Sequence, residues 1–413
     1  MNITELGKLA RKASYTLSVI DTKTKNNALL SIADALDKNR NIILDANEDD
    51  IKRSFSSDMP PVMRDRLKLD EARINSMIDG IKSIAALNDP VGSCIDAYTL
   101  PNGLTLMKER VPLGVIGIIY ESRPNVTVDA AALCLKAGNA VILRGGSDAI
   151  SSNKALADIM RSALDVYGLK DAVALIEDTS RQSSIELMQM TEYLDVLIPR
   201  GGAGLIRSVV ANAKVPVIET GVGNCHVYID NAADLEMGAE ILFNAKCSRP
   251  SVCNAAETLL VARSVANKFL PMAKIRLDEK QVELRGCPET KAILGDCVKP
   301  ATEDDYYTEY NDYILAVKVV QDVDEAIEFI NTHSTHHSEA IVTRDYATSE
   351  KFLKSVDSAA VYVNASTRFT DGGEFGLGAE IGISTQKMHA RGPMGVEALT
   401  SMKYIVRGNG QVR

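Results

Sequence analysis

The segment Gly114-Val115-Ile116-Gly117-Ile118-Ile119-Tyr120 begins the part of the sequence that decides the fold. Its residues are nearly all apolar and several are β-branched, which is typical of a strand buried on both faces of a parallel sheet. A helical pattern follows from Thr127 to Ala137, and a second short apolar run, Ala140 to Arg144, predicts the next strand. A strand, a helix and a strand in this order predict a βαβ unit.

The alternation of strands and helices continues along most of the chain. Further strands are predicted at 172–176, 196–199 and 216–219, with helices at 149–167, 183–190 and 204–213. After Cys253 we expect strands near 257–261, 314–319, 340–342 and 360–363, covered by helices near 264–275, 323–331 and 347–356. The sequence therefore predicts an α/β protein with two doubly wound domains and a boundary near Thr220 to Val222.

Helices and a hairpin precede the first predicted strand of this region. Apolar positions at helical spacing predict helices between Ile3 and Ser56, with Asp21 or Thr22 as a cap, and another helix from Glu71 to Leu87. The run from Tyr98 to Met107 is typical of a hairpin with Asn-Gly at its turn. No other strand is predicted nearby, so we expect the hairpin to project and to pair with another segment.

The composition is that of an ordinary soluble globular protein. Of 413 residues, 46% are hydrophobic and 24% are charged, and the length is sufficient for two or three domains. The net charge of −9 and the lack of a dense basic run argue against nucleic-acid binding. We find neither a run of about 18 apolar residues nor a signal-peptide pattern, so we expect no membrane association and a cytoplasmic location.

The cysteines and histidines do not form an obvious metal site. Seven cysteines are scattered along the chain, and their odd number and spacing argue against both a disulfide framework and a zinc site. His333, His336 and His337 lie close in sequence, but no carboxylate or thiol ligand stands at a useful spacing. We therefore expect no metal, and we interpret the histidine-rich segment as a solvated loop.

One segment carries the strongest signal for chemistry: Asn244-Ala245-Lys246-Cys247-Ser248-Arg249-Pro250-Ser251-Val252-Cys253-Asn254. A helical run ends in it and a strand-like run leaves it, and such a junction can hold a reactive group and leave it accessible. Lys246 and Arg249 add positive charge, which favours a thiolate. We interpret Cys253 as a covalent nucleophile. The alternative is that Cys253 is a buried structural cysteine like most others.

Glycines follow two of the predicted strands, in Leu143-Arg144-Gly145-Gly146-Ser147 and in Pro199-Arg200-Gly201-Gly202-Ala203-Gly204. Glycines at such places let a phosphate approach the backbone N–H groups of the next helix, although turn geometry alone also requires glycine. Neither segment matches the strict dinucleotide-binding fingerprint. Because each also contains an arginine, whose planar fork suits a phosphate, we expect a phosphate-bearing cofactor, with NADP favoured over NAD.

Longer motifs, distributed over most of the chain, identify the family that it resembles. The most specific are Ser248 to Asn254 and the segment Phe369-Thr370-Asp371-Gly372-Gly373-Glu374-Phe375-Gly376-Leu377-Gly378-Ala379-Glu380-Ile381-Gly382. Supporting motifs are Tyr120-Glu121-Ser122-Arg123-Pro124-Asn125, Ile218-Glu219-Thr220-Gly221 and Ala390-Arg391-Gly392-Pro393. On these motifs the chain resembles the aldehyde dehydrogenase superfamily from end to end, and within it the glutamate-5-semialdehyde dehydrogenase branch.

The resemblance implies roles for individual residues. Cys253 is the implied nucleophile, and Glu219 stands at the spacing of the superfamily's glutamate base. Arg144 with Gly145, and Gly201 with Gly202, fall at the two cofactor loops, and Glu309 matches the glutamate that holds the nicotinamide ribose.

The resemblance fails at the oxyanion-binding asparagine of the superfamily. That asparagine would fall near Glu121 or Ser122, and neither position holds one, although Asn125 is close. We therefore expect the backbone N–H of Cys253 to bind the oxyanion. Asn125 and Arg249 are expected to contact the substrate, and Lys246 is either a second substrate contact or only a helix-end charge.

The implied reaction is the NADPH-dependent reduction of L-glutamyl 5-phosphate, a small-molecule substrate, to L-glutamate 5-semialdehyde and phosphate. It proceeds through a Cys253 thioester, uses NADP(H) as cofactor and is the second step of proline biosynthesis from glutamate. Two alternatives stay open: a hydrolytic NAD(P)-dependent aldehyde dehydrogenase, and a catalytically idle scaffold. The intact Cys253 and the two glycine loops argue against the scaffold.

The resemblance also assigns the parts of the chain. Residues 1–95 and 112–221 would form the cofactor-binding α/β domain, and 222–399 the catalytic α/β domain with Cys253. Residues 96–111 and 400–413 resemble the hairpin and tail strand through which superfamily members oligomerise. We therefore expect a homo-oligomer, a dimer or higher. The sequence leaves open whether the chain associates with glutamate 5-kinase, which makes the acyl phosphate.

Overall fold

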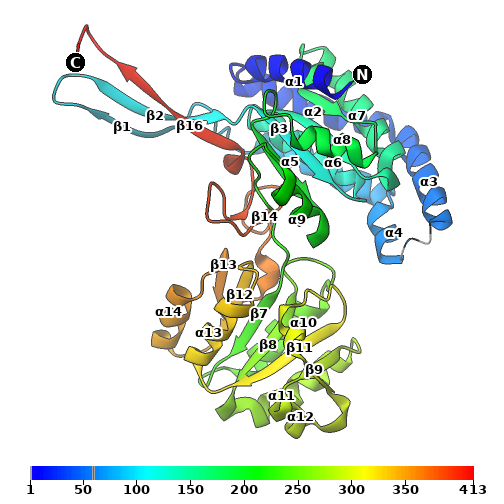
Figure 1. Cartoon of the computed structure of the whole chain (residues 1–413), viewed down its shortest axis with the longest axis vertical. Helices are drawn as coiled ribbons and strands as arrows, with labels where there is room; N and C mark the ends of the chain where they lie inside the picture. Colours follow the sequence, from blue (N-terminus) through cyan, green and yellow to red (C-terminus); the bar gives the residue numbers. More distant parts are fainter. Residues whose placement is uncertain (1, 58, 60) are drawn as a thin grey trace. The chain divides into compact units, whose positions relative to one another are not determined.

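The chain folds into two compact units (Figure 1). The structure is a computed structural model, and it describes residues 2–57, 59 and 61–413. Unit 1 runs from the N-terminus to Thr220 and adds Gly376–Gly382 and Pro393–Arg413, whereas unit 2 contains Gly221–Phe375 and Ile383–Gly392. The chain thus divides near the expected boundary, but residues 376–382 and 393–399, expected in the second domain, belong to unit 1.

A parallel sheet with the strand order β5-β4-β3-β6 forms the core of unit 1. Its strands are β3 (Val115–Tyr120), β4 (Ala140–Gly145), β5 (Val173–Leu175) and β6 (Val196–Arg200). Every residue of β3 is buried, as its apolar and β-branched sequence predicts. The connecting helices confirm the predicted alternation: α6 (Pro124–Lys136), η1 (Ser147–Ala149), α7 (Ile150–Asp165), η2 (Lys170–Ala172), α8 (Arg181–Met188) and α9 (Ala203–Asn212).

Helices at the start of the chain complete the globular part of unit 1. They are α1 (Ile3–Leu17), α2 (Thr22–Lys38), α3 (Arg40–Ser56), α4 (Pro61–Leu67) and α5 (Glu71–Ala86). Asp21 is the N-cap of α2, because its Oδ1 accepts a hydrogen bond from the backbone N–H of Thr24 at 2.7 Å. Most apolar residues of α2 are buried on one face at helical spacing, and Leu30 is exposed, so the predicted helical periodicity is confirmed. Among the described residues, no helix has the length and hydropathy that crossing a membrane requires.

The predicted hairpin is confirmed, and it pairs with the tail of the same chain. Strands β1 (Cys94–Thr99) and β2 (Thr105–Pro112) are antiparallel, and Gly103 in their turn has a φ of 87°, which favours glycine. After η6 (Glu397–Leu399), β16 (Thr400–Arg407) lies antiparallel to β2 along its whole length. The three strands form a ribbon that extends from the rest of unit 1 (Figure 1).

Unit 2 is built on a parallel sheet with the order β10-β9-β11-β8-β7-β12-β13. Its strands are β7 (Cys225–Ile229), β8 (Ala256–Ala262), β9 (Glu283–Gly286), β10 (Lys299–Pro300), β11 (Ile314–Val320), β12 (Ser338–Val342) and β13 (Ala360–Val363). The helices are α10 (Leu235–Cys247), α11 (Arg263–Asp278), α12 (Pro288–Leu294), η3 (Gly295–Cys297), η4 (Glu303–Tyr307), α13 (Val323–His333), α14 (Tyr346–Ser355) and η5 (Thr367–Phe369). Two short strands follow, β14 (Ile383–Ser384) and β15 (Gly392–Pro393).

One strand that was predicted from the sequence does not form, and others were not predicted. The segment 216–219 forms no strand; Val217 only makes an isolated bridge with Leu197, because Pro216 has no N–H to donate to a ladder. No strand was predicted at the position of β7, which lies between β8 and β12. Its His226 is fully buried against the carboxylate of Glu339, with Nδ1 2.9 Å from Oε2. A polar residue that a neighbouring strand satisfies cannot be distinguished from a loop residue by sequence alone.

The prediction of a solvated histidine loop is also wrong. His333 and His337 are buried. The Nδ1 of His333 lies 2.8 Å from the carbonyl oxygen of Phe329, and its ring stacks on the Phe329 ring with centroids 3.9 Å apart. The Nε2 of His333 lies 2.8 Å from Oε1 of Glu303, so both of its ring nitrogens have partners, whereas the buried Nε2 of His337 has none among the described residues. Among the described residues, no group of three or more His, Cys, Asp or Glu side chains has the geometry to hold a metal ion.

Candidate active site

Cys253 lies in unit 2 in the turn between α10 and β8, and it is partly exposed. The next residue, Asn254, is buried and fixes this turn to the segment that begins at η5. Its Nδ2 donates to the carbonyl oxygen of Thr370 at 2.9 Å, and its own carbonyl accepts from the Thr367 hydroxyl at 2.7 Å. The turn is therefore rigid while the thiol is accessible, as the position of Cys253 between a helix and a strand predicted.

The backbone at Gly223 packs directly against Cys253. A Cβ added to Gly223 would lie 1.5 Å from the carbonyl oxygen of Cys253 and 2.7 Å from its Cα, so any larger residue would displace the turn. The N–H of Gly223 donates to Oε1 of Glu309 at 2.9 Å. The structure thus brings Glu309 into the neighbourhood of Cys253 through Gly223. Its role toward a nicotinamide ribose stays a prediction.

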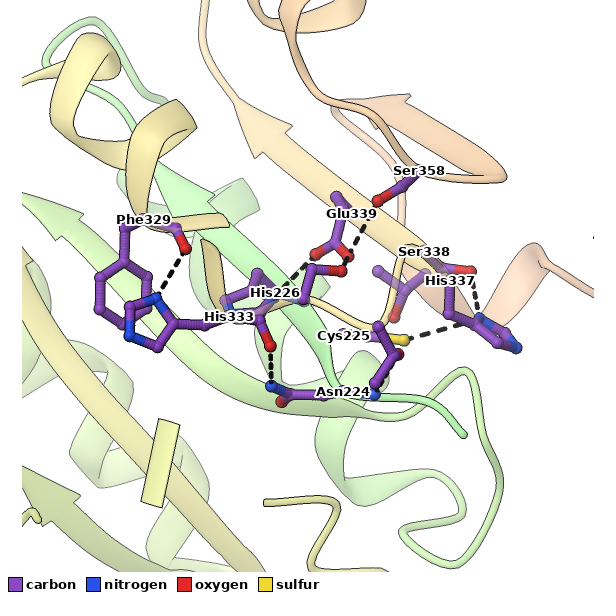
Figure 2. Close-up of polar contacts among 12 residues, drawn as sticks. Asn224, Cys225, His226, Phe329, His333, His337, Ser338, Glu339 and Ser358 are labelled. Atoms are coloured by element: carbon purple, nitrogen blue, oxygen red, sulfur yellow. Dashed lines mark hydrogen bonds and ion pairs between the residues drawn. The ribbon is translucent and has the colours of Figure 1, made fainter. Parts of the chain in front are cut away.

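Cys225, His337 and Ser338 form a chain of buried polar groups (Figure 2), and the Cys225 end of this chain adjoins the carbonyl of Cys253. The Cys225 thiol donates to that carbonyl at 3.2 Å, and its sulfur lies 3.7 Å from Nδ1 of His337. The same Nδ1 is 2.8 Å from the Ser338 hydroxyl, which donates to Thr370 Oγ1 at 2.7 Å. Burial lowers the pKa of His337 to about 4, so its imidazole is neutral at physiological pH. Neutral groups therefore support the Cys253 turn from within unit 2.

Burial distinguishes Cys253 from several other cysteines. It raises the pKa of Cys247 to about 11, and it raises the pKa of Cys134 and of Cys225 further above the ordinary value. These thiols stay protonated, and a thiol is a far weaker nucleophile than a thiolate. Cys94 and Cys297 are exposed but lie on the projecting ribbon and on η3. Cys253 combines access with a rigid turn, which supports its prediction as the nucleophile.

Lys246 has a different environment from the one that the sequence indicated. Its ammonium group is fully buried and pairs with Glu257 on β8, with 2.5 Å between Nζ and Oε2. Burial lowers the pKa of Lys246 and raises the pKa of Glu257, because each charge has lost its hydration. The other carboxylate oxygen of Glu257 accepts from the N–H of Asn311 at 3.2 Å. The charge of Lys246 is therefore paired with Glu257 inside unit 2 and is not exposed at the surface.

Two arginines flank the Cys253 turn. The predicted Arg249 is exposed just after α10. The second, Arg368 on η5, was missed from the sequence; its Nε donates to the Ser248 hydroxyl at 3.1 Å, and its Nη1 donates to Oδ1 of Asn254. Partial burial lowers the pKa of Arg368, and the positive charge of Arg249 lowers it further. An arginine directly before the motif that begins at Phe369 was the sequence signal that could have identified it.

Arg144 and Gly145 lie at the end of β4 in unit 1. The Nη2 group of Arg144 donates to the carbonyl oxygens of Thr179 and Ser180 at 2.6 and 2.8 Å, so the guanidinium holds the loop before α8. Partial burial lowers its pKa, but a guanidinium remains charged at physiological pH. A Cβ on Gly145 would lie 2.2 Å from Nδ2 of Asn153, which gives this glycine a packing role. The predicted ribose contact of Arg144 stays a prediction.

Gly201 and Gly202 lie at the exposed N-terminus of α9, where the first backbone N–H groups have no partner within the helix. The N–H of Gly202 donates to Oε2 of Glu121 at 2.9 Å, and a Cβ on Gly201 would lie 2.6 Å from Cδ of Glu121. A helix N-terminus that holds a carboxylate oxygen has the chemistry to hold a phosphate oxygen. The residues at this end of the sheet therefore fit a phosphate-bearing cofactor.

Asn125 and Glu219 also belong to unit 1. The Nδ2 group of Asn125 donates to Asp129 one turn along α6 at 2.9 Å. Burial raises the pKa of Asp129 to about 6. Glu219 is half-buried just before Thr220, whose hydroxyl donates to the carbonyl of Pro199 at 2.8 Å. The substrate contact of Asn125 and the catalytic role of Glu219 stay predictions.

Comparison with known proteins matches this chain, over nearly its whole length, to proteins that share one name. A curated protein named gamma-glutamyl phosphate reductase from Clostridium perfringens (strain SM101 / Type A) is 60% identical over 408 residues, 98% of each chain. One of the same name from Caldanaerobacter subterraneus subsp. tengcongensis is 56% identical over 414 residues and all of both chains. The crystal structure of gamma-glutamyl phosphate reductase from Thermotoga maritima superimposes with a TM-score of 0.97 at 50% identity, covering 99% of each chain.

More distant structures share the fold alone. An acetylating aldehyde dehydrogenase from Geobacillus thermoglucosidasius is 17% identical and superimposes with a TM-score of 0.72 over 99% of this chain and 97% of the other. The family model described as the aldehyde dehydrogenase family matches residues 2–295 and 308–405. The predicted resemblance and the predicted α/β fold are therefore confirmed, and the chain belongs to the aldehyde dehydrogenase family.

Proposed function

We propose that this chain catalyses the NADPH-dependent reduction of L-glutamyl 5-phosphate to L-glutamate 5-semialdehyde and phosphate, the second step of proline biosynthesis from glutamate. The observation that carries the proposal is the partly exposed Cys253, held in a rigid turn while several other cysteines of the chain are buried. The name shared by its relatives at 56–60% identity supports the choice of substrate.

In the first step the thiolate of Cys253 attacks the acyl carbon of the substrate. A carbon–sulfur bond forms, the bond between that carbon and the phosphate oxygen breaks, and the phosphate leaves with the electron pair. During the attack the carbonyl oxygen becomes negative, and the backbone N–H of Cys253 stabilises it. An acyl phosphate is already activated, so this step requires no acid to assist the leaving group.

A bound NADPH supplies the hydride that reduces the resulting thioester to the aldehyde. The residues of this chain that would hold it are Gly201 and Gly202 at the N-terminus of α9, with Arg144 at the end of β4 and Glu309 beside Gly223. Arg144 would favour the extra phosphate of NADP over NAD through its charge. When the aldehyde leaves, the electron pair of the carbon–sulfur bond returns to Cys253.

The test is the reverse reaction with glutamate 5-semialdehyde and NADP⁺. The proposal predicts that reduction of NADP⁺ continues beyond a single turnover only when inorganic phosphate is present, because phosphate must attack the thioester to regenerate the thiolate. Reduction that continues at the same rate without phosphate would show the alternative, a hydrolytic aldehyde dehydrogenase. Absence of any turnover, in protein that binds NADPH, would leave only a catalytically idle scaffold of this fold.

A further inference from the structure

Two cationic side chains near Cys253 are not neutralised by an ion pair. Arg249 is exposed in the turn after α10, and Arg368 is half-buried on η5. Within the described part of the chain, neither guanidinium forms a salt bridge with a carboxylate, whereas Arg263, Arg276 and Arg285 of the same unit do. Two nearby positive charges without a partner repel each other, and a bound anion would relieve that repulsion.

The position of Arg368 is fixed by neutral groups. Its Nε donates to the Ser248 hydroxyl at 3.1 Å, and its Nη1 donates to the side-chain oxygen of Asn254. Asn254 in turn donates to the backbone carbonyl of Arg368 at 3.3 Å. These bonds place the guanidinium beside the residue that follows Cys253. Among the described residues, none accepts a hydrogen bond from Nη2, so this amino group is available to a ligand.

The remaining charges around Arg368 do not pair with it. Asp371 and Glu374 attract it from the following segment, and Cys253 does so when ionised, whereas Arg249 repels it. The Oδ1 of Asp371 accepts from the backbone N–H of Gly373 at 2.8 Å, which uses that carboxylate in its own turn. The local balance therefore leaves a guanidinium whose charge is only partly compensated and whose direction is fixed.

We propose that Arg368, together with Arg249, binds the phosphoryl group of the substrate beside Cys253, and binds inorganic phosphate there in the reverse reaction. This inference rests on the proposed function. A guanidinium presents planar, paired donors that match phosphate oxygens. The phosphoryl group is bonded through one oxygen to the carbon that Cys253 attacks, so it must lie close to the thiol. Three carbon atoms separate that acyl carbon from the α-carboxylate of the same substrate.

The site has a chemical consequence for the first step. As the bond between the acyl carbon and the phosphate oxygen breaks, that oxygen gains negative charge. A fixed guanidinium next to it stabilises this charge without reorganising. The alternative is that Arg368 only holds Asn254 in place. In that case its loss would slow turnover but would leave the affinity for phosphate unchanged.

The direct test measures phosphate binding by protection of Cys253 from alkylation. Iodoacetamide labelling of the peptide that contains Cys253 is followed by mass spectrometry, with and without inorganic phosphate at constant ionic strength. In the wild-type protein phosphate should slow the labelling. In Arg368→Gln the phosphate concentration required for half-protection should rise at least about tenfold. Equal protection in the wild type and in Arg368→Gln would overturn the proposal, as would a lack of protection in the wild type.

Two further variants complete the experiment. Arg249→Gln removes the exposed cation, which has no hydrogen bond to any described residue, and it should weaken protection even if Arg368→Gln fails to fold. Arg263→Gln is the matched control, because Arg263 pairs with Glu289 at the opposite end of β8. In this variant phosphate should protect Cys253 from alkylation as it does in the wild type. Loss of protection in Arg263→Gln equal to that in Arg368→Gln would contradict a local site.

Steady-state kinetics then identifies the group that is bound. In the reverse reaction, Arg368→Gln should raise the KM for phosphate at least about tenfold and leave the KM for the semialdehyde nearly unchanged. A rise in the semialdehyde KM alone would assign the arginine to the α-carboxylate and overturn the proposal. If the wild-type enzyme turns over without phosphate, the proposed function is wrong. If the wild type depends on phosphate but Arg368→Gln has an unchanged KM for phosphate, only the present inference is wrong.

Discussion

At the scale of single residues, the account depends on which thiol becomes covalently bound. Cys253 and Cys247 stand at the two ends of one short segment, but their environments differ. Cys253 is partly exposed in a turn, whereas Cys247 is buried at the end of α10 with a pKa raised by burial to about 11. The environment, and not the residue type, therefore determines which of them reacts.

The first prediction compares alanine at these two positions. Cys253→Ala removes the group that carries the acyl intermediate, so kcat should fall at least about 1,000-fold while NADPH still binds. Cys247→Ala removes only a small buried side chain and should retain activity within about tenfold. The measurement is NADPH oxidation with the acyl phosphate, and NADPH binding by fluorescence is the control. The opposite ranking of the two variants would show that the nucleophile is wrongly assigned.

Glu219 leads to a second prediction. In hydrolytic relatives a glutamate at this spacing activates water, but the proposed forward reaction uses none, and in reverse phosphate is already an anionic nucleophile. Glu219→Gln should therefore keep phosphate-dependent activity within about tenfold, which corresponds to about 1.4 kcal/mol of barrier. An activity loss as deep as that of Cys253→Ala, in folded protein that binds NADPH, would show that Glu219 moves a proton.

At the scale of the elements, the buried groups that support the Cys253 turn lie at the beginnings of β7 and β12. Cys225 opens β7, and His337 stands directly before β12. The neutral imidazole of His337 lies near the Cys225 sulfur and the Ser338 hydroxyl, and it is fully buried. Protonation would place an uncompensated charge in this interior.

The third prediction follows from the pKa of His337. Burial lowers it to about 4 from an ordinary value of 6.5, so the unfolded chain binds a proton more readily than the folded one. The contribution of His337 to the free energy of unfolding should therefore be fully present at pH values above the ordinary pKa of 6.5. It should decrease as the pH falls toward the pKa of the folded state, by about 2 kcal/mol between pH 7 and pH 5. Denaturant unfolding at both pH values measures this, with His337→Gln as the comparison. The variant should lose less stability than the wild type over that interval; an equal loss would exclude His337 as the cause.

The elements also show how far sequence reasoning extends. Strand β3 and its neighbours were predictable because a strand buried on both faces must be apolar, and this requirement appears directly in the sequence. Strand β7 was not predictable, because it contains His226, whose Nδ1 pairs with Glu339 from another strand. Arg368 was missed for the same reason: its partners Ser248 and Asn254 are distant in sequence. Local patterns report local constraints, and contacts between distant segments do not appear in them.

At the scale of the whole molecule, the ribbon of β1, β2 and β16 is the part that the rest of its unit does not cover. Strand β2 lies in the middle, so β1 and β16 are both edges with unpaired backbone groups. Exposed apolar side chains lie along both of them: Ile95, Tyr98, Met402, Tyr404 and Val406. An edge of this kind favours pairing with another chain.

The fourth prediction is that the protein is a homo-oligomer, a dimer or higher, in which this ribbon meets a second copy. Closed symmetric dimers commonly satisfy exposed strand edges. Sedimentation velocity at micromolar concentration should show at least a dimer, and Tyr404→Lys in β16 should shift it toward the monomer. Tyr346→Lys on α14 is the matched control outside the ribbon, because Tyr346 is also an exposed tyrosine. A fully active, strictly monomeric wild type at that concentration would contradict the prediction.

The central claim is that the reaction proceeds through a thioester on Cys253 that only phosphate resolves. The most direct measurement is a rapid-mixing experiment with enzyme, glutamate 5-semialdehyde and NADP⁺ in phosphate-free buffer. We predict a burst of NADPH equal to the concentration of Cys253, then no further production until phosphate is added, and no burst in Cys253→Ala. Continuous NADPH production without phosphate, or a burst that survives in Cys253→Ala, would contradict the account.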